Sequence, residues 1–447
     1  MLALAVCVLA FIACYFAGRR SLGHGLAVLL AFGYFYGILR ANLLTTFSHF
    51  IFDAGMIGLY LSFKWQTSDP EEKQRTSKVL LWTTLLVLWP LLLVVMPFQP
   101  LLISLVGLRG NIYFIPLLVL GSRLKNKDLI TLSVGMALLD LVAVGFGAAE
   151  YFLGVPRFFP VSPVTELIYS SGDVEGGFLR IPATFSGAHA FGGTMISTLP
   201  YLIGLWTNAT KRLHRMLALA AIPAALMGML MSATRSNFLI GCIIVLFFVL
   251  TAKVKGRQRI FFMVMIGVVA AAALTNVRFQ RFKTLSDTDY VTERVAGSVN
   301  RGFWEILVEY PMGNGLGGGG TSIPYFLEGQ VRHPIGMENE YARILSEQGV
   351  IGLLVWLSFV IWFFSRYRTA FAKTPWANAR KVLWGMSAFG FGTAWIGTGL
   401  LTAIPGTLML MVGVGWTVTQ PLPDTVASPR LQRPTLRRKV YAEALNS

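Results

Sequence analysis

Charged residues are scarce in this chain, and this scarcity limits its class. Only 13% of the 447 residues are Asp, Glu, Lys or Arg, whereas 55% are hydrophobic, and the mean hydropathy is +0.62. A soluble protein of this length cannot keep so much apolar surface away from water. The composition therefore excludes an ordinary soluble protein and indicates an integral membrane protein.

Cysteine and histidine are also scarce, which bears on redox and metal chemistry. Cys7, Cys14 and Cys242 lie within apolar runs and form no CxxC pair, so neither a disulfide framework nor a zinc site is supported. The five histidines are scattered, and no region gathers enough ligands for a metal. We therefore expect no metal and no cofactor.

Apolar runs of membrane-spanning length recur along nearly the whole chain. A hydrocarbon core about 30 Å thick needs about 20 such residues in a helix. Spans are predicted near 2–17, 24–40, 43–63, 79–97, 99–121, 128–149, 190–208, 214–233, 236–253, 258–276, 346–366, 381–400 and 402–419. The first span is expected to stay, because it lacks a basic leader and a convincing cleavage site. The prediction is an all-α polytopic bundle of about 12–13 spans.

The net charge of +17 comes largely from the connections on one side of these spans. Alternate connections carry most of the Lys and Arg, at 19–20, 64–78, 123–127, 211–215, 253–259, 366–381 and 430–439. The positive-inside rule makes this side cytoplasmic. The charge is then a topology signal that requires no nucleic-acid partner, although the basic tail could contact anionic membrane lipids.

Two long connections fall on the opposite, extracytoplasmic side. The chain divides into N-terminal membrane helices (1–149), a first outer loop (150–189), central membrane helices (190–276), a second outer loop (277–345), C-terminal membrane helices (346–419) and a basic cytoplasmic tail (420–447). Both loops are expected to carry short helices. The alternative is that the second loop is an ordinary structured loop with no catalytic role.

The second loop combines charge with glycine. A short helix from Arg301 ends at Pro311, and 314–320 then contains five glycines in seven positions, whose backbone can take positive φ and approach a ligand closely. No Lys follows as a nucleotide-binding P-loop requires, so this function is rejected. We expect these glycines to shape a lid or to line a path for a glycan.

A second short amphipathic helix, 337–345, is predicted to lead into the next span. It places Glu338 at the lip of the membrane, on one face with Tyr341 and Leu345. Transfer to an alcohol needs a group that accepts the proton of the hydroxyl. Glu338 and His333 are the candidates, with Glu340 as an alternative on another face.

Arginines on the outer side could bind an anionic substrate. Guanidinium groups bind diphosphate oxygens bidentately and neutralise the charge that grows as a diphosphate leaves. The candidates are Arg180, Arg235, Arg301, Arg332 and Arg343. Arg180 and Arg235 could instead have a structural role, either by capping helix carbonyls or by reaching the lipid headgroups.

In this order, these residues resemble the O-antigen ligase/polymerase superfamily of bacterial envelope glycosyltransferases. The resemblance covers roughly residues 170–360. It comprises Arg180 before PATFSG, Arg235 in SATRS, Arg301 with Pro311, Gly313 and Gly315, and then Glu338, Asn339, Tyr341, Leu345, Gly349 and Gly352. One position departs from the pattern, because ligases of the family carry His where this chain has Glu338.

The resemblance implies a GT-C-like fold and metal-independent transfer of a glycan from an undecaprenyl-diphosphate donor at the periplasmic face of the bacterial inner membrane. Glu338, Arg301 and Arg180 would be catalytic, and Arg235, Arg332, Arg343, His333, Asn339 and Tyr341 would bind substrate. The acceptor would be a glycan or a lipid, and a chain-length regulator is a candidate partner.

The departure at Glu338 favours a polymerase of O-antigen, capsule or exopolysaccharide over a ligase that transfers glycan to lipid A-core. A transporter or flippase of lipid-linked oligosaccharide is the alternative from another class. Transporters place polar binding residues near the middle of the membrane, whereas the charges here gather in the outer loops.

Overall fold

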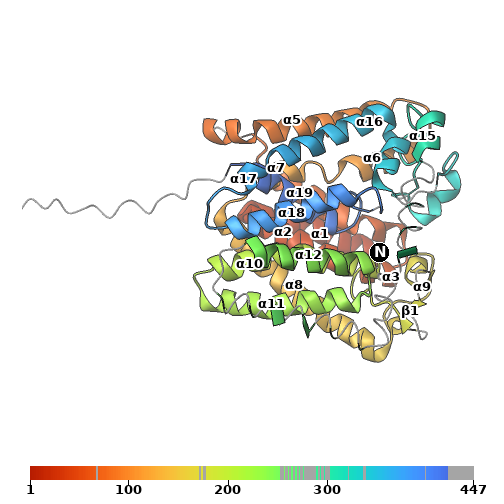
Figure 1. The fold of residues 1–447 in the computed structure, drawn as a ribbon. Helices are drawn as coiled ribbons and strands as arrows, with labels where there is room; N and C mark the ends of the chain where they lie inside the picture. Colours follow the sequence, from red (N-terminus) through yellow and green to blue (C-terminus); the bar gives the residue numbers. More distant parts are fainter. Residues whose placement is uncertain are drawn as a thin grey trace, which may run out of the picture.

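A computed structural model describes most of the chain. It covers residues 1–66, 69–170, 173–174, 178–251, 303–320, 322–335, 339–397 and 399–420, with isolated positions between 256 and 296. The described residues are almost entirely helical (Figure 1). The prediction of an all-α bundle is therefore confirmed, apart from one small hairpin in which Asp173 pairs with Leu179.

The elements follow one another along the chain with short connections. The α-helices are α1 (Leu2–Arg20), α2 (Leu22–Tyr34), α3 (Tyr36–Asn42), α4 (Ile51–Ser62), α5 (Pro70–Leu93), α6 (Leu101–Ile112), α7 (Leu117–Ser122), α8 (Asn126–Leu153), α9 (Glu166–Ser170), α10 (Ala188–Asn208), α11 (Arg212–Met231), α12 (Arg235–Thr251), α15 (Phe303–Glu309), α16 (Glu340–Ser365), α17 (Tyr367–Ala370), α18 (Ala377–Thr393) and α19 (Gly406–Val418). Single 3-10 turns form η1 (Thr46–Phe50), η2 (Val155–Arg157) and η4 (Tyr325–Gln330), and the hairpin strands are β1 (Asp173–Val174) and β2 (Phe178–Leu179).

Six helical segments of the described chain are long and apolar enough to cross a membrane, or seven if the bent pair α2 and α3 forms one span. The six are α1, α5, the stretch Leu101–Ser122, α8, α11 and α16. Several leave large apolar side chains exposed, such as Leu85, Leu88 and Leu92 on α5. Exposed apolar surface of this kind suits contact with lipid tails.

A helical segment occupies each predicted span within the described residues, but some are short. At a rise of about 1.5 Å per residue, the 13 residues of α19 cannot by themselves cross the core of a bilayer. The span predicted near 258–276 falls mostly outside the described residues. The count of 12–13 spans therefore stays a prediction.

The two ends of the bundle differ in character. At one end, α17 and the start of α5 lie near the end of α19 (Figure 1). There Arg380 Nη2 donates to the carbonyls of Thr417 and Thr419 at 2.9 and 2.7 Å, and Arg75 donates to the Gln420 carbonyl at 3.3 Å. Connections that the sequence assigned to one side of the membrane thus lie together.

The other end carries both long connections (Figure 1). The first contains η2, α9 and the hairpin, and the second contains α15 and η4. Short segments join them: the α3 residue Ile38 packs against the first connection, and the η1 residue His49 packs its ring against Tyr325 and Phe326 of η4, at centroid distances of 5.9 and 5.4 Å. This end therefore holds the candidate site.

Candidate active site

Arg180 lies directly after β2 and is buried, with 4% of its surface exposed. Its Nε donates to the Ser232 carbonyl at 3.3 Å, and its Nη2 donates to Thr234 Oγ1 at 2.7 Å. Ser232 caps the C-terminal end of α11, where carbonyls carry partial negative charge. Arg235 is half-buried and begins α12. The structure thus brings Arg180 to the SATRS element of Arg235 and gives Arg180 a carbonyl-capping contact.

The PATFSG segment is fixed by a buried carboxylate. Glu150, near the end of α8, is 1% exposed, and its Oε2 accepts a hydrogen bond from the Ala183 backbone at 2.8 Å. Ala183 has a φ of +50°, an uncommon conformation for a residue with a side chain. The next residue, Thr184, accepts from the backbone N–H of Ile38 on α3 at 3.0 Å. Glu150 therefore holds the loop that follows Arg180.

The first connection is ordered by its own hydrogen bonds. Thr165 Oγ1 donates to the Pro160 carbonyl at 2.8 Å, and the Tyr169 hydroxyl donates to the Phe159 carbonyl. Burial raises the pKa of Tyr169 above its ordinary value, and the negative charge of Glu150 adds to the effect. The tyrosine therefore stays a neutral donor at physiological pH.

Two of the three predicted catalytic residues, Arg301 and Glu338, lie outside the described residues. Their neighbours in the chain nevertheless meet. The ring of Phe303, at the start of α15, lies 5.3 Å from the indole of Trp395, and the ring of Tyr341 lies 4.6 Å from the same indole. The segments that follow Arg301 and Glu338 therefore converge on Trp395.

Asn339 and Tyr341 use their side chains within the protein. Asn339 caps α16, since its Oδ1 accepts from the backbone N–H groups of Tyr341 and Ala342 at 2.9 and 3.1 Å. The Tyr341 hydroxyl donates to the Phe391 carbonyl at 2.8 Å. Asn339 Nδ2 is buried and has no hydrogen-bond partner among the described residues. The hydroxyl of Tyr341 and the Oδ1 of Asn339 are therefore used within the protein, whereas in the described part of the chain the Asn339 amide nitrogen is not.

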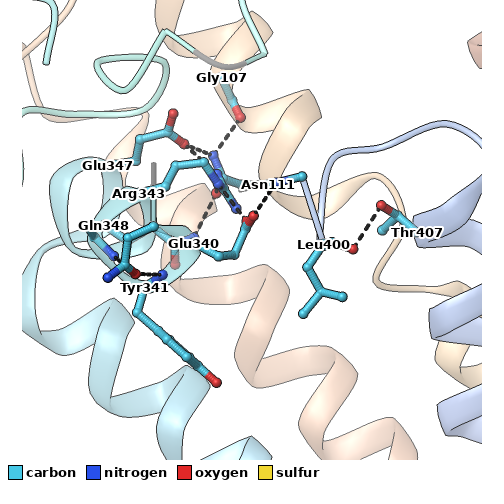
Figure 2. A network of polar contacts seen from close by, with 12 residues as sticks. Gly107, Asn111, Glu340, Tyr341, Arg343, Glu347, Gln348, Leu400 and Thr407 are labelled. Carbon is cyan, nitrogen blue, oxygen red and sulfur yellow. Dashed lines mark hydrogen bonds and ion pairs between the residues drawn. The ribbon is translucent and has the colours of Figure 1, made fainter. Parts of the chain in front are cut away.

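Arg343 sits at the centre of a buried ionic network (Figure 2). Its Nε donates to Glu340 Oε1 at 2.8 Å, and its Nη1 donates to Glu347 Oε2 at 3.1 Å. The same nitrogen also donates to Asn111 Oδ1 of α6 at 3.1 Å. We call Asn111, Glu340, Arg343, Glu347 and Gln348 the closed network, because each of them is buried.

The closed network ties α16 to α6 and to the segment before α19. Asn111 Nδ2 donates to Glu347 Oε2 at 2.5 Å and to the Gly107 carbonyl at 2.8 Å, while Gln348 Nε2 donates to Asn111 Oδ1 at 2.8 Å. The other oxygen of Glu340 accepts from the Gly399 backbone at 2.8 Å. Each arm of the network therefore fixes the first turns of α16.

This arrangement revises the expectation that Arg343 binds diphosphate. A guanidinium that is enclosed by protein and held by two carboxylates has its charge and its donors already engaged. The predicted amphipathic helix is also wrong in one respect, since 340–349 is buried on every side and Glu340 turns into the protein. Arg343 thus positions the start of α16 instead of facing a ligand.

The glycine-rich segment packs against two helices. Gly313, Gly315, Gly317 and Gly320 have φ values from +71° to +89°, which confirms the expected use of positive φ. A Cβ on Gly107 of α6 would lie 2.1 Å from the Gly317 nitrogen. These glycines therefore let the loop backbone touch α6, and the close partner seen here is protein backbone.

Arg332 and His333 are exposed. Their carbonyls accept from Asn314 Nδ2 at 3.2 and 2.9 Å, and Gln99 Nε2 donates to the Arg332 carbonyl at 2.9 Å. His333 has a φ of +49°. Their backbone is thus pinned to the glycine-rich segment while the side chains stand at the surface of the same end of the bundle.

Sequence reasoning did not single out Asn111, Glu150, Glu347 or Trp395. A signal existed for the first two, because a polar residue in or at the end of a predicted span is costly and marks a structural or functional contact. Within the described residues, no group of three or more His, Cys, Asp or Glu could hold a metal ion.

No protein-family model matches this chain, and no curated protein matches it significantly. The case for a function therefore depends on the residues themselves.

Proposed function

We propose that this protein is a membrane glycosyltransferase that extends or transfers a glycan from an undecaprenyl-diphosphate donor at the periplasmic face of the bacterial inner membrane. The observation that supports it best is the meeting of the segments that follow Arg301 and Glu338 on Trp395. Because this meeting occurs at the end of the bundle that carries both long connections, a cation and a carboxylate can serve one substrate there (Figure 1).

The reaction would need no metal. Arg301 and Arg180, with help from Arg235 and Arg332, bind the diphosphate of the donor and stabilise the negative charge that develops on it. An acceptor hydroxyl attacks the anomeric carbon of the donor sugar, and the bond from that carbon to the diphosphate oxygen breaks. Undecaprenyl diphosphate leaves, and Glu338 takes the hydroxyl proton.

The surrounding residues would orient these groups. The unpaired Asn339 Nδ2 can donate to a sugar oxygen, and the exposed His333 can contact the acceptor. The closed network fixes the first turns of α16, whose cap Asn339 directly follows Glu338 in the chain. Preorganised positions of this kind lower the cost of reaching the transition state.

The test is chain growth by purified protein in nanodiscs with lipid-linked repeat units, scored by the length of the product. Arg301→Ala and Glu338→Gln should each abolish elongation at unchanged protein abundance. The matched controls are Arg368→Ala, at the other end of the bundle, and Glu328→Gln, an exposed carboxylate of the same connection. Normal product length in both active-site variants would refute the proposal.

The same assay separates the alternatives. A ligase would transfer the glycan only when lipid A-core is supplied as acceptor. A transporter would form no glycosidic bond, and would instead move the lipid-linked glycan between leaflets. We favour the polymerase because a carboxylate stands at position 338, where ligases that the sequence resembles carry histidine.

A further inference from the structure

A second cluster of charges lies at the same end of the bundle and is not part of the site described above. Arg109 on α6 donates from Nε and Nη2 to Asp53 Oδ2 on α4, at 3.0 and 2.7 Å. Tyr113 donates from its hydroxyl to the Asp53 carbonyl at 2.5 Å. These contacts join α4 and α6 through an ion pair.

A second arginine, Arg40, stands beside this pair. Its guanidinium lies over the ring of Tyr36, 5.1 Å from the centroid, and the Tyr36 hydroxyl donates to the His49 carbonyl at 3.0 Å. The charges of Arg40, Arg109 and Asp53 all lie near enough to Tyr36 to act on its hydroxyl. We call Arg40, Asp53 and Arg109 the open cluster.

The open cluster has two guanidinium groups and one carboxylate. Among the described residues, Arg40 forms no ion pair with a carboxylate, and its Nε is buried without a hydrogen-bond partner. A guanidinium with a buried, unsatisfied donor and no carboxylate partner is costly until an anion pairs with it. The cluster therefore has an excess positive charge and an unsatisfied donor.

The cluster is also open to a ligand, unlike the network around Arg343. The Arg109 side chain is 28% exposed, and Arg40 is half-buried. Large exposed apolar side chains lie on the neighbouring segments, namely Leu44, Phe47, Phe50, Tyr325 and Phe326. A ligand at this place would meet cations at one point and apolar surface around it.

We propose that Arg40 and Arg109 bind the phosphate headgroup of a membrane lipid whose acyl or prenyl chain lies along these apolar side chains. Two guanidinium groups can hold a phosphate bidentately and balance its charge. The unpaired Asp53 Oδ1 can accept a hydrogen bond from a hydroxyl of the same headgroup. The Tyr36 ring fixes the Arg40 guanidinium in place.

The site is distinct from the proposed donor site. Arg180 contacts the turn between α11 and α12, whereas Arg40 and Arg109 face Tyr36 and Asp53. The η4 turn is packed on His49, so the second connection lies beside the open cluster. Lipid binding here requires no glycosyl transfer, and the two proposals can fail separately.

The experiment measures lipid binding by native mass spectrometry of the full chain in detergent, in an Arg301→Ala background that weakens the proposed donor site. The probes are phosphatidylglycerol, undecaprenyl monophosphate, diacylglycerol and inorganic phosphate. The two phosphate lipids should bind and diacylglycerol should not. Arg40→Gln should weaken binding of the phosphate lipids by about tenfold, whereas Arg19→Gln, an exposed arginine on α1, should leave it unchanged.

Arg109→Gln alone could unfold the protein, because it leaves Asp53 without its cation. The double variant Arg109→Gln/Asp53→Asn removes both charges and should bind the phosphate lipids as weakly as Arg40→Gln. Equal binding by wild type and Arg40→Gln, equal binding of diacylglycerol, or binding of inorganic phosphate alone would overturn the proposal. None of these results depends on product formation.

Discussion

The closed network and the open cluster contain the same kinds of side chain but serve different purposes. In the closed network, Arg343 is enclosed with Glu340 and Glu347, and its Nε and Nη1 donate to protein oxygens. In the open cluster, Asp53 pairs with Arg109, Arg40 forms no ion pair with a described carboxylate, and both arginines are partly exposed. Charge balance and access, more than residue type, separate a structural arginine from one that can hold a ligand.

The two groups also differ in how far their cations are buried. A buried cation must be neutralised by protein, because water cannot reach it. A cation near the membrane surface can be neutralised by a lipid phosphate, which the bilayer supplies in excess. We therefore expect mutations in the closed network to change stability and mutations in the open cluster to change binding.

The largest effect is expected for Arg343→Ala. It leaves Glu340 and Glu347 buried without their cation, at a cost of about 3–5 kcal/mol. The thermal unfolding temperature in detergent should fall sharply. Adding Glu340→Gln and Glu347→Gln should recover much of the loss, and Arg368→Ala, which is exposed, should have no effect. An unchanged unfolding temperature for Arg343→Ala would remove the distinction between the two clusters.

A smaller effect is expected for Gly107→Ala. The new methyl group would lie 2.1 Å from the Gly317 nitrogen, so the glycine-rich segment must move away from α6. Overpacking of this kind costs about 1–3 kcal/mol. Gly145→Ala on α8 is the matched control, because its Cβ would meet nothing within 4 Å. Equal thermal unfolding temperatures for the two variants would contradict the close packing of α6 against the glycine-rich segment.

Asp53→Asn should act on binding in the opposite direction from Arg40→Gln. Removing the carboxylate frees the Arg109 charge, so the affinity for phosphatidylglycerol should rise several-fold, with a modest loss of stability. Glu347→Gln in the closed network should leave lipid affinity unchanged. Native mass spectrometry gives both values, and equal changes in the two variants would show that the open cluster is not the lipid site.

The smallest effect on stability is expected for Arg40→Gln. Because Arg40 forms no ion pair with a described carboxylate, its replacement should change stability by no more than about 0.5 kcal/mol while lipid binding falls. The measurement is thermal unfolding with and without phosphatidylglycerol. A large loss of stability without lipid would assign Arg40 a structural part instead.

Sequence reasoning predicted the helical membrane fold, and six of the predicted spans, or seven with the bent pair, coincide with helices long and apolar enough to cross a membrane. Apolar runs of 20 residues have few other solutions, since backbone groups in lipid must be paired within a helix. It also anticipated the positive φ of the glycine-rich segment. These are local properties, and local sequence carries them.

The contacts of the candidate site were harder to predict from the sequence. The sequence did not reveal that Arg343 would be enclosed within the protein, because its hydrogen bond to Asn111 joins residues 232 positions apart. Arg180 and Thr234 meet across 54 residues for the same reason. The spacing of Glu340 and Arg343 allows an i,i+3 pair on one helix, but the predicted amphipathic pattern of 337–345 did not reveal that this pair would be buried, since periodicity does not show what packs against a face.

Hydrophobicity and charge placement along the chain determined that this protein belongs in a membrane and that its fold is helical, because burial in lipid rewards apolar length and punishes unpaired backbone. Only the tertiary structure decided which arginines form contacts within the protein and which remain available to a ligand. The outcome depends on distances between residues remote in the chain, because a charge is neutralised only when an opposite charge packs beside it.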